Sequence, residues 1–301
     1  MRKSEFFMEL SGDAGGMLPW RTYRDYYEFA RNHSGCSIVE LGTGRGASTI
    51  ALAAGLKDSG REGFVHAVDQ FFQHAPGGPH PASLREYGEA TVDMNLTAFR
   101  DNLSRFHVKD KVKAQVSRTT DALIDPASDG PFDMLVIDVD GYVDRDLEKY
   151  FDYLEHGSLI IIDDYRDSVN SRGVTNLERF SRLGVDKAGE KIDRLSSYER
   201  GRLLGKHLLT YRLIERMVKL GLLEPLKNVR GTLFCRKPLG SAAFEAVWTA
   251  SISRAVEESV VDDFMHLLRG GRTDFPLSMR YWRPHAARIA RRFMNRIGRA
   301  E

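Results

Sequence analysis

The sequence predicts an α/β fold in which a mostly parallel sheet is covered by helices on both faces. Segments typical of strands and helices alternate over the first 166 residues. The strand segments, such as FDMLVI at 132–137, are apolar almost throughout rather than at every second position. Strands that are buried on both faces have this composition, and strand–helix alternation favours parallel pairing.

The elements follow one another in a Rossmann-like order. Expected strands lie at 37–41, 63–68, 113–117, 132–137 and 158–162, with a last one at 231–237. Expected helices lie at 20–32, 47–56, 91–106 and 147–154, and charged helical segments at 181–222 and 241–268. We therefore expect a helical segment at 1–35, a ligand-binding domain at 36–238 with a helical insertion at about 181–222, and a helical extension at 239–301.

Composition limits the classes of partner and the compartment. The chain has 301 residues and a net charge of +2, which gives no reason to expect a nucleic-acid partner. Its two cysteines, Cys36 and Cys235, lie beside strand segments and exclude a disulfide framework or a cysteine metal site. The N-terminus lacks a sustained apolar run, so we expect no signal peptide and a cytoplasmic protein.

The C-terminal segment 280–299 carries seven arginines around an apolar stripe. A basic amphipathic helix of this kind can lie on an anionic membrane surface. Packing on its own domain or on a second subunit is the alternative that we favour. With the helical ends as contact surfaces, we expect a homodimer.

A glycine-rich turn follows the first strand. Glu40 ends that strand, and the turn reads Gly42, Thr43, Gly44 and, two residues on, Gly46. Glycines let a ligand approach the backbone closely. The glycine spacing and the preceding acid suit a ligand with an amino-acid head better than a dinucleotide, because Glu40 can reach an ammonium group.

An acid also ends the second strand. Asp69 stands at the position where a carboxylate typically accepts hydrogen bonds from both ribose hydroxyls of a nucleoside ligand. Together with the glycine turn it predicts a nucleoside site, to which we add its neighbour Gln70.

Three more carboxylates close the fourth and fifth expected strands. Asp138 ends one, and Asp163 and Asp164 end the run LIIIDDY. Neighbouring strands lie about 4.8 Å apart, so these groups can converge on one point at the carboxyl edge of the sheet. Three carboxylates make a hard oxygen site that suits Mg²⁺ or a similar cation. The alternative is that one member of the doublet only caps the following turn.

The motifs ELGTGRGAS, VHAVDQF, IDVDGYV and GSLIIIDDY, in this order, resemble class I S-adenosylmethionine-dependent methyltransferases. The closest resemblance is to the metal-dependent O-methyltransferases of the macrocin-type branch, which methylate sugars of natural products. It implies that Glu40 and the glycines hold the methionine part of the cofactor and Asp69 the ribose. It also places Thr119 and Thr120 on the adenine side, Asp138 beside the cofactor, and Asp138, Asp163 and Asp164 on the metal.

The resemblance further implies that Asp140 is a general base. The family pattern I-D-G-D-H-S-Y is altered here, because Val139 replaces the glycine, Gly141 replaces the histidine and Tyr142 comes one position early. His74 and His80 are second candidates for the base, since their Gly- and Pro-rich loop can close over the site. The implied reaction is methyl transfer to a hydroxyl of a small polar acceptor.

Other functions stay open at this level. A metal-independent N- or C-methyltransferase would keep the same cofactor motifs. There are three further alternatives: a relative that works as a hydroxylase, an NAD-dependent oxidoreductase and a non-catalytic binding protein. The oxidoreductase would need an acid–base pair on the nicotinamide side, and the sequence shows no such pair. Binding of S-adenosylmethionine against NAD separates the oxidoreductase from the methyltransferases.

Overall fold

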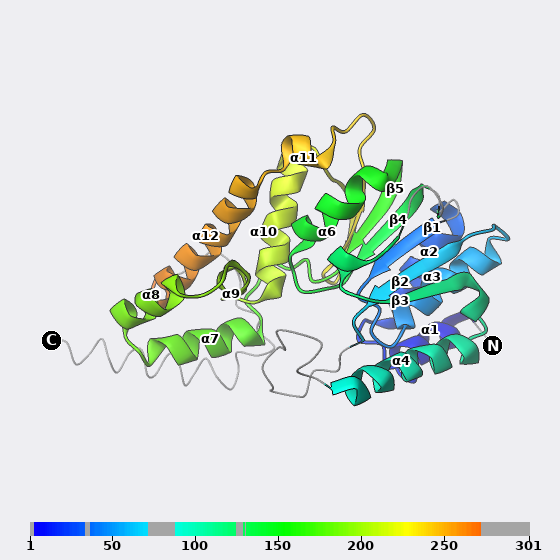
Figure 1. Ribbon diagram of the computed structural model, residues 1–301, viewed down its shortest axis with the longest axis horizontal. Coiled ribbons are helices and arrows are strands. Elements are labelled where there is room, and N and C mark those ends of the chain that lie inside the picture. Colours follow the sequence, from blue (N-terminus) through cyan, green and yellow to red (C-terminus); the bar gives the residue numbers. More distant parts are fainter. Residues whose placement is uncertain (1–2, 34–36, 72–87, 125–128, 130, 272–301) are drawn as a thin grey trace. The chain divides into compact units, whose positions relative to one another are not determined.

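The computed structural model describes all residues except 1–2, 34–36, 72–87, 125–128, 130 and 272–301 (Figure 1). The chain divides into two compact units. The first comprises Met1–Val139, Arg145–Asp163 and Leu222–Phe244. The second comprises Asp140–Asp144, Asp164–Gly221 and the residues from Glu245 onward.

A seven-stranded sheet forms the centre of the first unit. Its strands are β1 Ser37–Leu41, β2 Phe64–Asp69, β3 Val112–Val116, β4 Phe132–Ile137, β5 Leu154–Ile162, β6 Glu224–Val229 and β7 Thr232–Arg236. The spatial order is β3-β2-β1-β4-β5-β7-β6. The first five strands pair in parallel, and β7 is antiparallel to both β5 and β6. The predicted α/β class is therefore confirmed.

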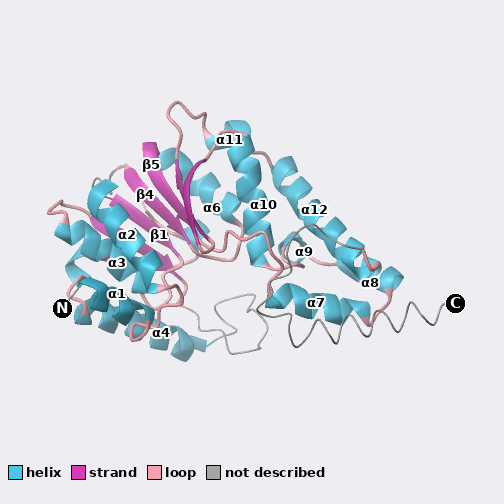
Figure 2. Cartoon of the chain, turned by 180° about the vertical axis from the view of Figure 1, so that it is seen from behind, coloured by secondary structure: helices cyan, strands magenta, loops and turns pink. Residues whose placement is uncertain are grey.

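The helices differ in length from one to more than five turns. They are α1 Lys3–Ser11, α2 Trp20–His33, α3 Ala47–Asp58, α4 Gly88–Arg105, α6 Val143–Tyr150, α7 Ser171–Ser181, α8 Val185–Asp193, α9 Ser197–Gly201, α10 Lys206–Lys219, α11 Phe244–Val247 and α12 Ala250–Leu268. In the first unit they flank the strands (Figure 2). Helical parts are thus present before and after the sheet, as expected.

One face of the sheet is covered by α1, α2, α3 and α4. Their apolar side chains form a single buried cluster with residues of β1, β2, β4, β5 and β7. Helices α2 and α3 approach closely because Gly55 has no side chain; a Cβ there would lie 2.3 Å from the Tyr27 carbonyl oxygen. Burying this face supplies the main stabilisation of the unit.

One strand and three element boundaries differ from the expectations. Strand β6 was not expected, because its side chains are largely exposed and it contains Pro225, both of which a strand tolerates only at an edge. Strand β5 begins at Leu154 instead of residue 158, and α6 begins at Val143 instead of residue 147. Helical structure after β5 starts at Ser171, ten residues earlier than predicted.

The second unit is helical in its described part. Two of its helices begin at clear N-terminal caps: the Asn170 side chain accepts from the Gly173 N–H at the start of α7, and Ser196 and Glu199 form a reciprocal capping box at the start of α9. Arg212 on α10 donates to Ser259 and pairs with Asp263 on α12. Among the described residues, no helix is long and apolar enough to cross a membrane.

Candidate functional site

The glycine turn after β1 has the backbone that only glycine adopts easily. Gly42, Gly44 and Gly46 have φ angles of 86°, 53° and 89°. A Cβ on Gly42 would lie 1.9 Å from the Asp138 carbonyl oxygen, so this glycine lets the turn pass the residue after β4. A Cβ on Gly44 would meet nothing within 4 Å. The turn is therefore packed on one side and open at Gly44, as a cradle for a ligand requires.

Glu40 lies at the base of this turn and is completely buried. The Thr49 hydroxyl donates to its Oε2 at 2.5 Å, whereas Oε1 has no hydrogen-bond partner among the described residues. Burial raises the pKa of the Glu40 carboxyl to about 7, although the Ser48 and Thr49 hydroxyls oppose the rise and Asp69 adds to it. A buried carboxylate oxygen of this kind suits a cationic group of a ligand.

The raised pKa makes a stability prediction for Glu40→Gln. The carboxyl titrates at 4.5 when unfolded and at about 7 when folded, so ionisation favours the unfolded state and the penalty grows as the pH rises between these values. Glutamine carries no such penalty. When the pH rises from 5 to 8, the free energy of unfolding of Glu40→Gln, measured relative to that of the native protein, should therefore increase by about 2 kcal/mol. Urea denaturation of both proteins at pH 5 and pH 8 checks this prediction. If the variant and the native protein differ in free energy of unfolding by the same amount at both pH values, the prediction is contradicted.

Asp69 has a role that the sequence did not indicate. Its Oδ2 accepts the backbone N–H groups of Thr43 and Gly44 at 2.7 and 2.8 Å, and its Oδ1 accepts that of Phe71 at 2.6 Å. A carboxylate has about four lone-pair positions, so three are already directed at the backbone. Asp69 thus holds the glycine turn in place, and about one of its lone-pair positions is left for a further donor.

The other expected cofactor residues lie near this edge of the first unit. The Thr119 hydroxyl is buried and donates to Asp146 on α6, and the Thr120 hydroxyl donates to Asp121. Lys149 donates to both threonine carbonyls, which fixes the short turn Thr119–Asp121. Gln70 follows β2 and is partly buried. The Thr119 hydroxyl proton and both threonine carbonyls are therefore already engaged within the protein.

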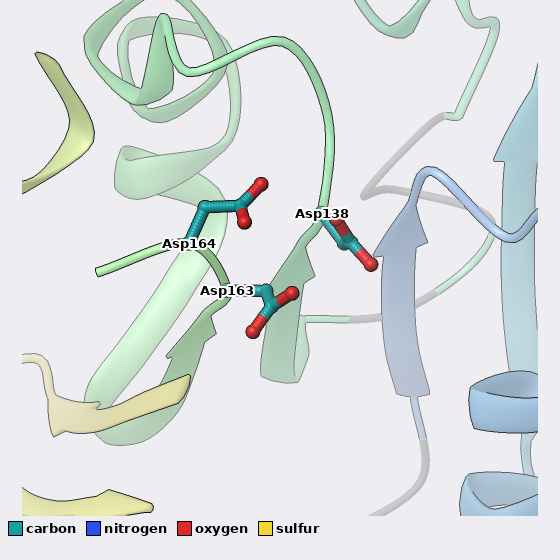
Figure 3. Close-up of side chains that lie close together, drawn as sticks. All are labelled: Asp138, Asp163 and Asp164. Carbon is teal, nitrogen blue, oxygen red and sulfur yellow. The ribbon is translucent and has the colours of Figure 1, made fainter. Parts of the chain in front are cut away.

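The three acids of the sequence analysis do come together. Carboxylate oxygens of Asp138, Asp163 and Asp164 all lie within 4.8 Å of one another (Figure 3). Backbone bonds extend the ladder past the strand ends, from the Asp138 N–H to Leu41 and from the Asp163 N–H to Ile137. The Thr232 hydroxyl donates to Asp163 Oδ1 at 2.7 Å. This donor set of hard oxygens fits a divalent cation.

Asp164 already has two nitrogen partners, which nothing in the sequence indicated. Lys206 and His207, at the start of α10, both pair with its carboxylate, His207 at 2.7 Å. Burial alone would raise the pKa of Asp164, but His207 and the Lys206 charge together hold it well below the ordinary value. The backbone of Asp164 is left-handed, with φ 60°, a conformation that Asp adopts more readily than most residues. Lys206 therefore holds a carboxylate oxygen that a cation bound by all three acids could also use.

Asp140 lies on the loop after β4, where Tyr142 donates its backbone N–H to Oδ1 at 3.2 Å. The Tyr142 ring stacks on that of Tyr198 with centroids 5.5 Å apart, and its hydroxyl donates to the Ser197 carbonyl at 2.7 Å. These contacts with α9 hold the loop that carries Asp140. His74 and His80 lie outside the described residues, as does the arginine-rich segment 280–299.

The chain was compared with curated proteins and with solved structures. No curated protein matches the chain. Among solved structures, it is similar to the SAH-bound methyltransferase PaMTH1 of Podospora anserina, with 18% identity, 79% of this chain and 88% of that chain covered, and a TM-score of 0.48. It is also similar to the O-methyltransferase of Bacillus cereus in complex with SAH, with 18% identity, 79% and 93% covered, and a TM-score of 0.44. Likenesses at this level support no argument about function.

A family model gives the identification. It is described as a methyltransferase domain, and it matches residues 39–165. This range begins within β1, contains the glycine turn and Asp69, and ends just after the acidic doublet. Residues 39–165 are therefore a methyltransferase domain, which confirms the predicted class of enzyme for this part of the chain.

Proposed function

We propose that the protein transfers a methyl group from S-adenosylmethionine to a hydroxyl of a small polar acceptor, such as a sugar of a natural product or glycan, with the help of a divalent cation. One observation carries the proposal. The glycine turn with its buried acid, Glu40, and the acidic group Asp138, Asp163 and Asp164 lie at the carboxyl ends of adjacent strands. Ligands of open α/β sheets bind at this edge.

The first part of the proposed site binds S-adenosylmethionine, which would supply an activated methyl group. Glu40 Oε1 would accept from its ammonium group, and the open backbone at Gly44 would lie against its amino-acid part. The remaining lone pair of Asp69 would take a ribose hydroxyl, and the Thr119–Asp121 turn would border the adenine. These residues bind and orient, which is most of what methyl transfer requires from a protein.

On the acceptor side, Asp138, Asp163 and Asp164 would hold the cation. A bound divalent cation lowers the pKa of a coordinated hydroxyl by several units, less for Mg²⁺ than for Zn²⁺. Asp140 would accept the proton, since it lies two residues after Asp138 on a loop that Tyr142 holds in place. His74 and His80 remain second candidates for this role.

Ligand binding tests the proposal against its main rival. Calorimetric titration of the purified protein with S-adenosylmethionine should give saturable binding, and titration with NAD should give none. Binding of NAD alone would favour the oxidoreductase. Methyl transfer from labelled cofactor to a panel of sugars, with and without EDTA, then separates the metal-dependent O-methyltransferase from a metal-independent N- or C-methyltransferase.

The ion pair between Lys206 and Asp164 leads to a prediction for Lys206→Gln. The Lys206 ammonium competes with a cation for the Asp164 carboxylate. Its removal should tighten Mn²⁺ binding several-fold, because the Coulomb repulsion between Lys206 and the cation is lost. Lys219→Gln is the matched control, since Lys219 is exposed at the other end of α10 and its loss changes the net charge equally. Equal Mn²⁺ affinities in all three proteins would show that Lys206 does not compete.

We further propose that the enzyme is a cytoplasmic homodimer that acts on a free small-molecule acceptor. The charge balance of the chain supports a small acceptor over a nucleic acid. Sedimentation equilibrium decides the oligomeric state directly.

A further inference from the structure

Tyr26 on α2 has a buried hydroxyl that the fold itself does not use. The residue is 1% exposed, and its hydroxyl has no hydrogen-bond partner in the described part of the chain. An unsatisfied buried hydroxyl costs about 1–3 kcal/mol. Its neighbours Tyr23 and Tyr27 on the same helix do have partners, the Leu18 N–H and Asp58. A tyrosine with an unused hydroxyl therefore calls for a reason other than packing.

The register of the sheet shows which strand residues share a face with the partner of the Tyr26 ring. One row of paired residues crosses the sheet, made up of Glu40, Val136, Ile161 and Phe234. Paired residues share a face, and residues two positions apart along a strand also share it. The Tyr26 ring meets the Phe234 ring edge-on, with centroids 6.0 Å apart, so α2 covers this face at β7.

The next row on the same face contains the acids. Asp163 follows Ile161 by two residues and Asp138 follows Val136 by two, and the backbone ladder continues through both. Thr232, two residues before Phe234 on antiparallel β7, donates to Asp163 from this row. Tyr26 thus packs on the row of residues next to the one that contains Asp138 and Asp163, two of the three candidate cation ligands.

The charges around Tyr26 fix its role as a donor. Burial raises the pKa of its hydroxyl well above the ordinary value, and the carboxylates of Asp163, Asp138 and Glu40, in this order, raise it further. The phenol therefore keeps its proton at every working pH. It can offer that proton to a carboxylate oxygen or to a water molecule.

We infer that Tyr26 is a positioning residue of the cation site, whose hydroxyl donates a hydrogen bond to an oxygen around the bound cation, either of Asp163 or Asp138 or of a water on the ion. The inference rests on the proposed cation site. Groups that hydrogen-bond to metal ligands orient them, and their loss typically weakens metal binding 10- to 100-fold. Tyr26 would then be retained for the ion, at a cost to the stability of the apo protein.

The test compares Tyr26→Phe with Tyr27→Phe. Each variant loses one hydroxyl from α2, but the Tyr27 hydroxyl donates to Asp58 at 2.6 Å. Tyr26→Phe should bind Mn²⁺ about tenfold more weakly in calorimetry and should unfold in urea at the same or a higher midpoint. Tyr27→Phe should unfold at a lower midpoint and bind Mn²⁺ as the native protein does. Both should keep the native affinity for S-adenosylhomocysteine in EDTA.

The outcomes separate this inference from the proposed function. If the native protein does not bind Mn²⁺, the cation site itself fails and the inference with it. If the native protein binds Mn²⁺ and Tyr26→Phe binds it equally well, only the role of Tyr26 is overturned. A Tyr26→Phe variant that is destabilised as Tyr27→Phe is, or that loses S-adenosylhomocysteine binding as well, would show an ordinary structural role and would also overturn it.

Discussion

Gly44→Leu is expected to weaken S-adenosylhomocysteine binding at least 100-fold, which corresponds to about 2.7 kcal/mol. Gly44 is exposed in the turn after β1, and a Cβ there would point into space that is free of protein atoms to 4 Å. In the proposed complex the amino-acid part of the cofactor fills that space, so a leucine side chain would exclude it. Calorimetry with S-adenosylhomocysteine measures the loss.

Gly60→Leu is the matched control. Gly60 also has a left-handed backbone, with φ 72° against 53° for Gly44, and a Cβ there also meets nothing within 4 Å. The backbone strain of a leucine at positive φ, about 1–2 kcal/mol, is therefore common to both variants. Gly60 lies in the turn after the C-terminal end of α3, whereas the glycine turn precedes the N-terminal end of that helix. Equal binding by the two variants would contradict the placement of the cofactor.

Asp163→Asn is expected to abolish measurable Mg²⁺ and Mn²⁺ binding. The substitution keeps the size of the side chain and an oxygen that can accept from the Thr232 hydroxyl, so the end of β5 should stay folded. It removes one negative charge from the group with Asp138 and Asp164. A divalent cation depends on these charges, and loss of one ligand charge in a site of three should cost at least 100-fold in affinity, or about 2.7 kcal/mol.

Asp193→Asn controls for the change in net charge. Asp193 is exposed at the end of α8 in the second unit. Its variant should bind Mn²⁺ with native affinity and S-adenosylhomocysteine likewise. If Asp163→Asn keeps native Mn²⁺ affinity, the acidic group is not a cation site, and the methyl transfer proposed here is independent of metal.

The sheet and the edge that carries the site could be predicted because their signals are local. Strands β1, β2 and β4 and the end of β5 are short, mostly apolar runs, and the turn glycines and strand-end acids are read directly from the sequence. Parallel pairing then brings Asp138 to Asp163 without further information, and the structure does place them together. Strand β6 gave no such signal, because an exposed edge strand needs no apolar pattern.

The partners of the site residues could not be predicted, because they come from distant parts of the chain. Lys206 lies 42 positions after Asp164, and nothing in its segment marks it as a partner of an acid. Tyr26 looks like one of several core aromatics of α2 until its contact with Phe234 and the register of β5 and β7 place it on the face of the sheet that carries Asp163. Asp69 was expected to bind ribose, and only the fold shows that it first holds the backbone of Thr43 and Gly44.

The central claim is that one sheet edge binds both an adenosyl cofactor and a divalent cation. Calorimetric titration of the native protein with S-adenosylhomocysteine, first in EDTA and then in Mg²⁺, tests it most directly. We predict saturable one-site binding in both buffers and a separate saturable Mg²⁺ binding that the Asp163→Asn variant lacks. Absence of S-adenosylhomocysteine binding in both buffers would contradict the account.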